Sequence, residues 1–194
     1  MYNKITYKIV NHIEASGGIS SEDREIYLFG VWQGMFMFLG IGTMALVGLL
    51  FRAFPYILLF VIAFMPLRSF AGGFHAKTQL RCYLASTITT VFIAIVSPIT
   101  VVNSSLMIAL LLVFAMLIIL LSPVGSANKP LDDLEKKVYK RKATKICLFE
   151  VFIALVFIPL GVHFVTTGIF WALVMVLILL LLELLFGKKH RTST

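Results

Sequence analysis

The sequence predicts an all-α, polytopic membrane protein: a helical bundle of about six transmembrane helices with an amphipathic N-terminal helix. Three observations predict it. First, 60% of the 194 residues are hydrophobic and only 13% are charged, whereas soluble domains contain roughly 45–50% apolar and about 25% charged residues. Second, the apolar residues form long runs, and third, the basic residues lie between alternate runs. We therefore expect a single integral-membrane domain over residues 1–194.

The N-terminal segment, residues 1–26, mixes acidic and basic residues and has no apolar core, so we do not expect a cleavable signal peptide. Within it, residues 2–15 could form an amphipathic helix, because Ile5, Ile9 and Ile13 are spaced four apart. Such a helix could lie on the membrane surface. It could equally pack on the bundle, and the sequence leaves both alternatives open.

Crossing a bilayer takes about 20 helical residues. Six apolar segments are candidates, at residues 27–50, 54–65, 83–102, 106–121, 146–163 and 168–186. The second is short and is flanked by Pro55 and Pro66; we expect its helix to end at Met65, because proline disfavours helix in the residue before it. We favour a full crossing over a re-entrant segment because the basic loops then fall on one side of the membrane.

The charge pattern predicts which side of the membrane each loop occupies. With six crossings, all 17 lysines and arginines except Arg52 fall on one side. By the positive-inside rule, both termini and the loops at 66–82 and 122–145 are cytoplasmic. The second of these loops contains a predicted helical run over 131–145, with its acidic residues early and its lysines late, as the helix dipole favours.

The first cytoplasmic loop contains the residues most suited to chemistry. Between Arg68 and Cys82 the chain places charges, two glycines and a histidine beside apolar segments, where polar groups are costly. Gly72 and Gly73 permit a sharp turn. Thr78 suits the N-cap of the next helix.

Cys82 would then lie in the first turn of that helix, where backbone amides and the neighbouring Lys77 and Arg81 favour a thiolate. A thiolate beside an imidazole is the usual arrangement for a cysteine nucleophile, so His75 is the candidate partner. Seven residues of ideal helix would separate the two by about 10.5 Å, whereas proton transfer needs roughly 2.6–3.2 Å or one bridging water. The loop must therefore bend between them.

The other cysteine, Cys147, is interpreted as a small core residue, and lone histidines such as His163 as hydrogen-bonded or solvated side chains. The two cysteines fit no CxxC or zinc-finger spacing and the chain has no HExxH sequence, so neither a metal nor another cofactor is expected. No nucleic acid is expected as a partner.

At this loop the sequence resembles the AgrB family (accessory gene regulator protein B), the membrane cysteine endopeptidases that process the quorum-sensing propeptide AgrD in Gram-positive bacteria. The chain length and the six-segment layout agree, so the resemblance covers essentially the whole chain. The matching residues are Arg68, Ala71-Gly72-Gly73, His75-Ala76-Lys77, Cys82, and the segment from Ser122-Pro123 through Asn128-Lys129-Pro130-Leu131.

The resemblance implies that Cys82 is the nucleophile and His75 the general base. Arg68 and Gly73 match family positions important for activity. Gly72, Lys77 and Lys129 are expected to support the site or to contact the substrate. A catalytic dyad is expected, and the candidates to orient His75 as a third member are left open: Asn128, Asp132 and Glu150.

The resemblance further implies the reaction: removal of the C-terminal tail of an AgrD-like propeptide through a Cys82 thioester, followed by cyclisation to a thiolactone or lactone. It implies a location in the bacterial cell membrane, contact with membrane lipids and a homodimer. The basic residues at 129–145 could bind the acidic tail. The alternatives are a non-enzymatic small transporter or channel, with Gly72-Gly73 in a re-entrant pore loop, or a membrane scaffold.

Overall fold

The computed structural model describes residues 3–20, 22–73, 78–101, 103–125 and 132–191, with side chains described as far as residue 185. This part of the chain is all-helical, which confirms the predicted class. The helices are α1 (Lys4–Ala15), α2 (Arg24–Leu50), α3 (Phe54–Ala71), α4 (Gln79–Ile99), α5 (Ser104–Leu121), α6 (Asp133–Phe157) and α7 (His163–Arg191).

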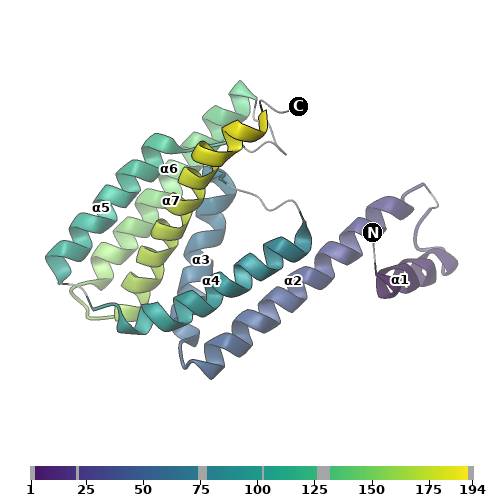
Figure 1. Cartoon of the computed structure of the whole chain (residues 1–194), viewed down its shortest axis with the longest axis horizontal. Helices are drawn as coiled ribbons and strands as arrows, with labels where there is room; N and C mark the ends of the chain where they lie inside the picture. The colour runs from purple at the N-terminus through teal and green to yellow at the C-terminus, as the bar shows by residue number, and fades with distance from the viewer. Residues whose placement is uncertain (1–2, 21, 74–77, 102, 126–131, 192–194) are drawn as a thin grey trace.

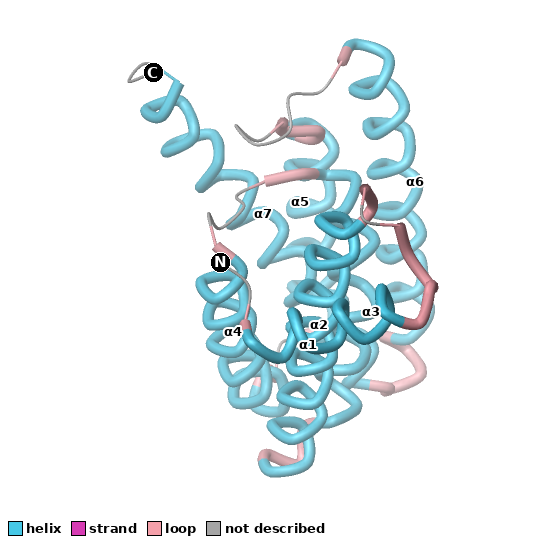
Figure 2. The backbone as a smooth tube through the Cα atoms, turned by 90° about the vertical axis from the view of Figure 1, so that its right-hand side faces the viewer, coloured by secondary structure: helices cyan, strands magenta, loops and turns pink. Residues whose placement is uncertain are grey.

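The helices form a bundle, and a pair of helices packs against its side (Figure 1). Helices α3, α5, α6 and α7 pack together, while α2 and α4 pack on each other and cross the bundle obliquely beside α3. The core consists of apolar side chains with no exposed surface, among them Leu67, Leu111, Ile118, Leu173 and Leu180. Helices α6 and α7 project beyond α3 and α5 at one end of the bundle, as Figure 2 also shows.

Within the described part of the chain, five helices are long and apolar enough to cross a membrane: α2, α3, α4, α5 and α7. The chain is therefore a polytopic helical membrane protein. The remaining expected segment, 146–163, is divided between the C-terminal part of α6, which ends at Phe157, and the turn and helix start that follow. In this part of α6, Cys147, Val151 and Ala154 are buried in the core.

The expectation that Pro66 ends its helix is wrong, because α3 continues through Pro66 to Ala71 and is 18 residues long. A proline removes one backbone hydrogen bond. Ending the helix in a membrane would leave more backbone groups without partners, so continuation is favoured. The residues beyond the proline also pack well, since Leu67 and Ala71 are fully buried.

The basic loop at 122–145 contains the predicted helical run. Its helical run is the beginning of α6, which continues into the apolar core without a break and is 25 residues long. The Asp132 backbone N–H donates to Glu135 Oε2 at 3.3 Å and stabilises the helix start. The predicted charge order is confirmed, because Asp133 and Glu135 lie in the first turn and the lysines follow.

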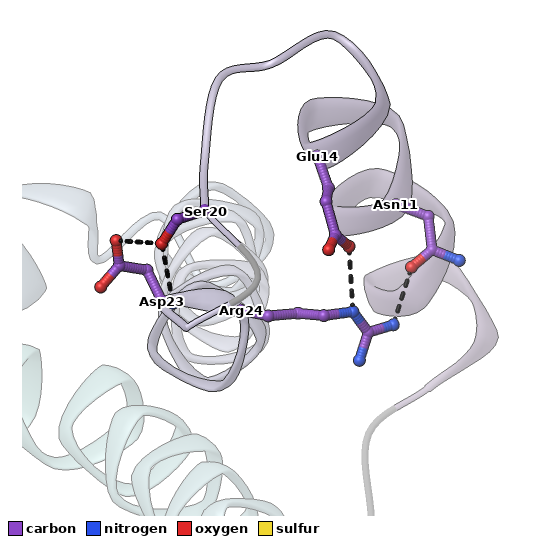
Figure 3. A network of polar contacts seen from close by, with 5 residues as sticks. All are labelled: Asn11, Glu14, Ser20, Asp23 and Arg24. Atoms are coloured by element: carbon purple, nitrogen blue, oxygen red, sulfur yellow. Dashed lines mark hydrogen bonds and ion pairs between the residues drawn. The ribbon is translucent and has the colours of Figure 1, made fainter.

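Helix α1 packs against α2 rather than standing free. Thr6 and Val10 are fully buried, and Arg24 at the start of α2 holds α1 in place (Figure 3). Arg24 Nε lies 3.1 Å from Glu14 Oε2, and Arg24 Nη2 donates to Asn11 Oδ1 at 2.8 Å. The alternative of packing on the helices is thus confirmed for one face. Residues Ile5 and Ile9 stay exposed, and their contact with a membrane surface remains a prediction.

Helices α3 and α7 pack closely at a glycine. A Cβ added at Gly168 would lie 2.8 Å from Leu59 Cβ and 3.2 Å from the Phe60 backbone nitrogen. Small residues allow helices in membranes to approach this closely. Gly168 therefore sets the distance between the two helices that hold most of the core.

Substituting Gly168→Ala should destabilise the protein by about 1–3 kcal/mol, because the new methyl group pushes α3 and α7 apart. The matched control is Gly42→Ala on α2, where an added Cβ meets nothing within 4 Å. The control should keep or slightly raise stability, since alanine favours helix by about 1 kcal/mol over glycine. Thermal unfolding in detergent measures both variants, and equal effects would contradict this description of the packing.

Candidate active site

Two segments that the sequence places on one side of the membrane meet at one end of the bundle. Val124 N–H donates to the Ala71 carbonyl oxygen at 3.0 Å, and Gly73 N–H donates to the Val124 carbonyl oxygen at 3.4 Å. These bonds make an isolated parallel bridge between Gly72 and Val124. The end of α3 is thereby joined to the segment that follows α5.

Both glycines of this turn are required by the backbone, as the sequence predicted. Gly72 has a φ of +81°, and a Cβ at this position would overlap the Val124 carbonyl oxygen. Gly73 has a φ of +110°, and its Cβ would lie 3.0 Å from the Leu179 carbonyl oxygen on α7. Residues other than glycine rarely adopt such φ angles. The turn therefore packs against two neighbouring segments at once.

Arg68 supports this turn from the last part of α3. Its Nη1 donates to the Gly72 carbonyl oxygen at 3.3 Å. The guanidinium also interacts electrostatically with Cys82 and with Glu183 of α7, and Glu183 is buried. Arg68 thus connects the glycine turn, the candidate nucleophile and α7.

Cys82 lies in the first turn of α4, as predicted. Thr78 is the N-cap, and its Oγ1 accepts a hydrogen bond from the Arg81 N–H at 3.3 Å. The Cys82 N–H donates to the Thr78 carbonyl oxygen at 3.0 Å. The Cys82 side chain is exposed, so the thiol is accessible at the positive end of the helix dipole.

Several predicted site residues lie outside the described residues: His75, Lys77, Asn128 and Lys129. The distance between His75 and Cys82 therefore remains a prediction. One condition on it is met, because α3 ends at Ala71 and α4 begins at Gln79, so no single helix contains both residues. The candidate Asp132 precedes α6 at an exposed position, whereas Glu150 is buried within α6 and its carboxylate oxygens have no hydrogen-bond partner among the described atoms.

Cys82 and Arg68 also line a cavity of about 210 Å³ between α2, α3, α4 and α7. Most of the cavity lining is apolar. It is formed by the turns of α3 that precede Arg68 and by the turns of α4 that follow Cys82. The arrangement joins an exposed thiol and a guanidinium to an apolar space within the bundle. Such a space suits the binding of an acyl group that the thiol attacks.

A basic surface lies at the same end of the bundle. A shallow hollow of about 360 Å³ is lined by Pro123 and by four cationic residues of α6: Lys136, Lys137, Lys140 and Arg141. Lys140 Nζ donates to the carbonyl oxygens of Ile119 and, at 2.7 Å, of Ser122. It therefore stabilises the end of α5 and joins α6 to the segment that contains Val124.

Cys147 is a core residue, as predicted: its side chain is fully buried, and its Sγ lies 4.0 Å from the Ala115 carbonyl oxygen. Across the described ranges, no group of three or more His, Cys, Asp or Glu side chains could hold a metal ion. The sequence did not predict the contact of Val124 with the glycine turn, nor a part for Leu179 or for the cavity residues other than Arg68 and Cys82. Glu183, an acidic residue within an apolar segment, is the signal that could have pointed to α7.

The fold and the site together define a polytopic helical membrane protein with an exposed thiol beside an arginine at one end of its bundle. Comparison with known families is consistent with this class. Residues 2–184 match the family Accessory gene regulator B, and the chain therefore belongs to the AgrB family of quorum-sensing membrane proteins.

Individual relatives agree with the family match. The chain is 34% identical to accessory gene regulator protein B of Staphylococcus saprophyticus over 55% of its length and 56% of that protein. It is 25% identical to an AgrB-like protein of Clostridium perfringens over 82% of the chain and 78% of the relative, and 30% identical to protein FsrB of Enterococcus faecalis over 63% and 50%. The chain thus spans about half the length of two of these relatives. No solved structure matches the chain.

Substituting Gly72→Ala should disrupt the joined turn, because the alanine Cβ overlaps the Val124 carbonyl oxygen. The matched control is Gly161→Ala between α6 and α7, where φ is +70° but an added Cβ meets nothing within 4 Å. The control should lose only the cost of a left-handed residue, about 1–2 kcal/mol. Thermal unfolding in detergent should show a clearly larger loss for Gly72→Ala, and losses of the same size would contradict the role of the Val124 contact.

Proposed function

We propose that this chain is a membrane cysteine endopeptidase that removes the C-terminal tail of an AgrD-like propeptide and promotes cyclisation of the remaining signal segment. The observation that supports this most directly is the exposed Cys82 thiol at the start of α4, next to Arg68 and an apolar cavity. Membership of the AgrB family supports the choice of substrate. The enzyme acts in the bacterial cell membrane, with both termini and the loop of Cys82 in the cytoplasm.

In the first step, Cys82 transfers its proton to His75 and its sulfur attacks the carbonyl carbon at the end of the signal segment. The C–N bond then breaks, and His75 returns the proton to the leaving amine. The products are a thioester between Cys82 and the signal segment, and a free tail with a new amino terminus.

In the second step, a thiol or hydroxyl group of the signal segment attacks this thioester. His75 takes the proton of the attacking thiol or hydroxyl, the bond between Cys82 sulfur and the carbonyl carbon breaks, and His75 passes the proton to the Cys82 thiolate as the peptide closes to a thiolactone or a lactone. The nucleophile of this step belongs to the peptide. Exchanging one thioester for another costs little free energy, so the step depends on keeping water away from Cys82.

Arg68 has two roles in this proposal. Its hydrogen bond to the Gly72 carbonyl oxygen fixes the turn that leads to His75. Its guanidinium, which lines the same cavity as Cys82, is proposed to stabilise the negative charge that develops on the attacked carbonyl oxygen. Lys77 and Lys129 are proposed to contact the substrate, with Gly72 and Gly73 shaping the backbone around them.

Substituting Cys82→Ala should abolish release of the tail while the protein remains folded in the membrane. Cys147→Ala is the matched control: Cys147 is buried in the core, so cleavage should continue, with stability reduced by about 1 kcal/mol at most for the small volume lost. Tail release from a purified AgrD-like peptide is followed by mass spectrometry. Undiminished cleavage by Cys82→Ala contradicts the proposal, and cysteine-independent solute flux would instead favour a transporter.

The basic hollow on α6 is proposed to bind the acidic tail of the propeptide. Replacing Lys136, Lys137 and Arg141 together with glutamate should raise KM at least about tenfold at low salt, and this difference should shrink at high salt because surface charges are screened. Lys140 is left unchanged because it bonds to the end of α5.

The control for this prediction changes charge elsewhere. Reversing Lys4 and Lys8 on α1 and Lys145 on α6 alters the net charge by the same amount outside the residues that line the hollow. This variant should leave KM nearly unchanged. If both triple variants raise KM equally, net charge rather than the hollow governs substrate binding.

A further inference from the structure

The apolar cavity beside Cys82 has a position that suggests a defined use. We propose that it is the specificity pocket for the peptide residue whose carbonyl Cys82 attacks, and that it selects a large apolar side chain at that position. The inference rests on the proposed function and adds to it the substrate feature that the enzyme recognises. Its occupant is a single side chain of the propeptide.

The lining of the cavity is arranged along the helices in a regular way. Phe60, Phe64 and Arg68 recur every four residues on α3, and Cys82, Ser86 and Thr90 recur in the same way on α4. Residues at this spacing lie on one helix face. The cavity therefore extends from Cys82 and Arg68 into the bundle, over about two helical turns.

The cavity walls offer apolar contact and few free polar groups. Phe60 and Phe64 stack with ring centroids 5.1 Å apart, and Met175 of α7 lines the cavity as well. The Thr90 hydroxyl donates to the Ser86 carbonyl oxygen at 2.8 Å. Its hydrogen-bond donor is therefore satisfied within α4. Ser86 and Thr89 add two hydroxyl groups and Arg68 a charge at one end, but most of the lining is apolar, so a charged side chain would lose its hydration here for few partners.

Chemical connectivity determines which peptide side chain can enter. When Cys82 attacks a carbonyl, the side chain of that residue is attached to the carbon next to the new thioester. It must therefore lie near Sγ, which itself borders the cavity. A volume of about 210 Å³ is too small for a folded peptide segment and suits one leucine, methionine or phenylalanine side chain.

This occupant also bears on the second step of the reaction. An apolar side chain in the cavity would cover the Cys82 thioester from the side of the bundle and displace water from it. Hydrolysis would then be slowed relative to attack by the peptide's own thiol or hydroxyl. A small side chain would leave space for water and should increase the fraction of linear product.

The competing occupant is a lipid acyl chain, because the cavity lies between helices that can cross the membrane. A lipid would fill it whatever the peptide sequence. The peptide is favoured because the cavity contains the candidate nucleophile and Arg68 at one end. Neither group is needed to hold a hydrocarbon chain.

The test varies the peptide and the pocket together. Peptides with leucine, alanine or tryptophan before the cleaved bond are each tested with the wild type, with Ser86→Leu, which fills the cavity, and with Met175→Ala, which enlarges it. The wild type should prefer leucine over alanine by at least about tenfold in kcat/KM. Ser86→Leu should lose this preference while still cleaving the alanine peptide, and Met175→Ala should gain relative activity on a tryptophan peptide.

A second measurement does not depend on proteolysis. In the Cys147→Ala background, Cys82 is alkylated by two chloroacetamides, one with an isobutyl group and one with a hydroxymethyl group. The isobutyl reagent should react about tenfold faster with the wild-type pocket, and Ser86→Leu should remove this advantage. The rates are measured in detergent and in lipid nanodiscs, and an advantage seen only in detergent would assign the cavity to lipid and overturn the inference.

The two measurements separate the inference from the proposed function. If cleavage requires Cys82 but shows no preference at the varied position, the specificity pocket is wrong and the peptidase proposal stands. If Cys82 is not required for cleavage but alkylation is selective, the peptidase proposal is wrong, and with it the pocket's role in peptide specificity.

Discussion

The backbone contact between Gly72 and Val124 is the constraint on which the candidate site depends. It joins the end of α3 to the segment after α5 through two hydrogen bonds, and only glycine at position 72 allows the two backbones to come this close. Arg68 bonds to the same turn and interacts with Cys82 and Glu183. Four segments distant in sequence are therefore held together at one end of the bundle, and the chain entering the loop toward His75 has a fixed starting direction.

The membrane explains why the chemistry is concentrated there. Helices must satisfy their own backbone groups in lipid, so turns and polar side chains gather at the helix ends. The thiol of Cys82 is exposed at such an end, while the cavity beside it is enclosed by apolar faces of neighbouring helices. An exposed thiol at the helix ends and an apolar cavity within the bundle together suit the proposed reaction, which must exclude water. The basic beginning of α6 adds a charged surface at the same end.

Composition and hydropathy were enough to predict the helical class, the helix start at Thr78, the glycine turn and the buried state of Cys147, because each depends on local chemistry. The prediction that Pro66 ends its helix was wrong because the local effect of a proline was outweighed by burial of Leu67 and Ala71. The sequence left open whether the charged run and the apolar segment of α6 form one helix, because a change from charged to apolar residues looks like a boundary although the backbone needs none. The pairing of Gly72 with Val124 and the shared cavity depend on contacts between distant segments, which a single sequence does not encode in any local pattern.

A disulfide-trapping experiment tests most directly whether the joined turn brings His75 to Cys82. A His75→Cys variant is prepared in the Cys147→Ala background and oxidised mildly in nanodiscs, and the intrachain bond is quantified by mass spectrometry. Disulfides form when the two Cα atoms are roughly 4.4–6.8 Å apart. Rapid, nearly complete bonding is expected between positions 75 and 82, and much slower bonding when Gly72→Ala is added. Failure to form the bond, or bonding unaffected by Gly72→Ala, would contradict this role of the turn.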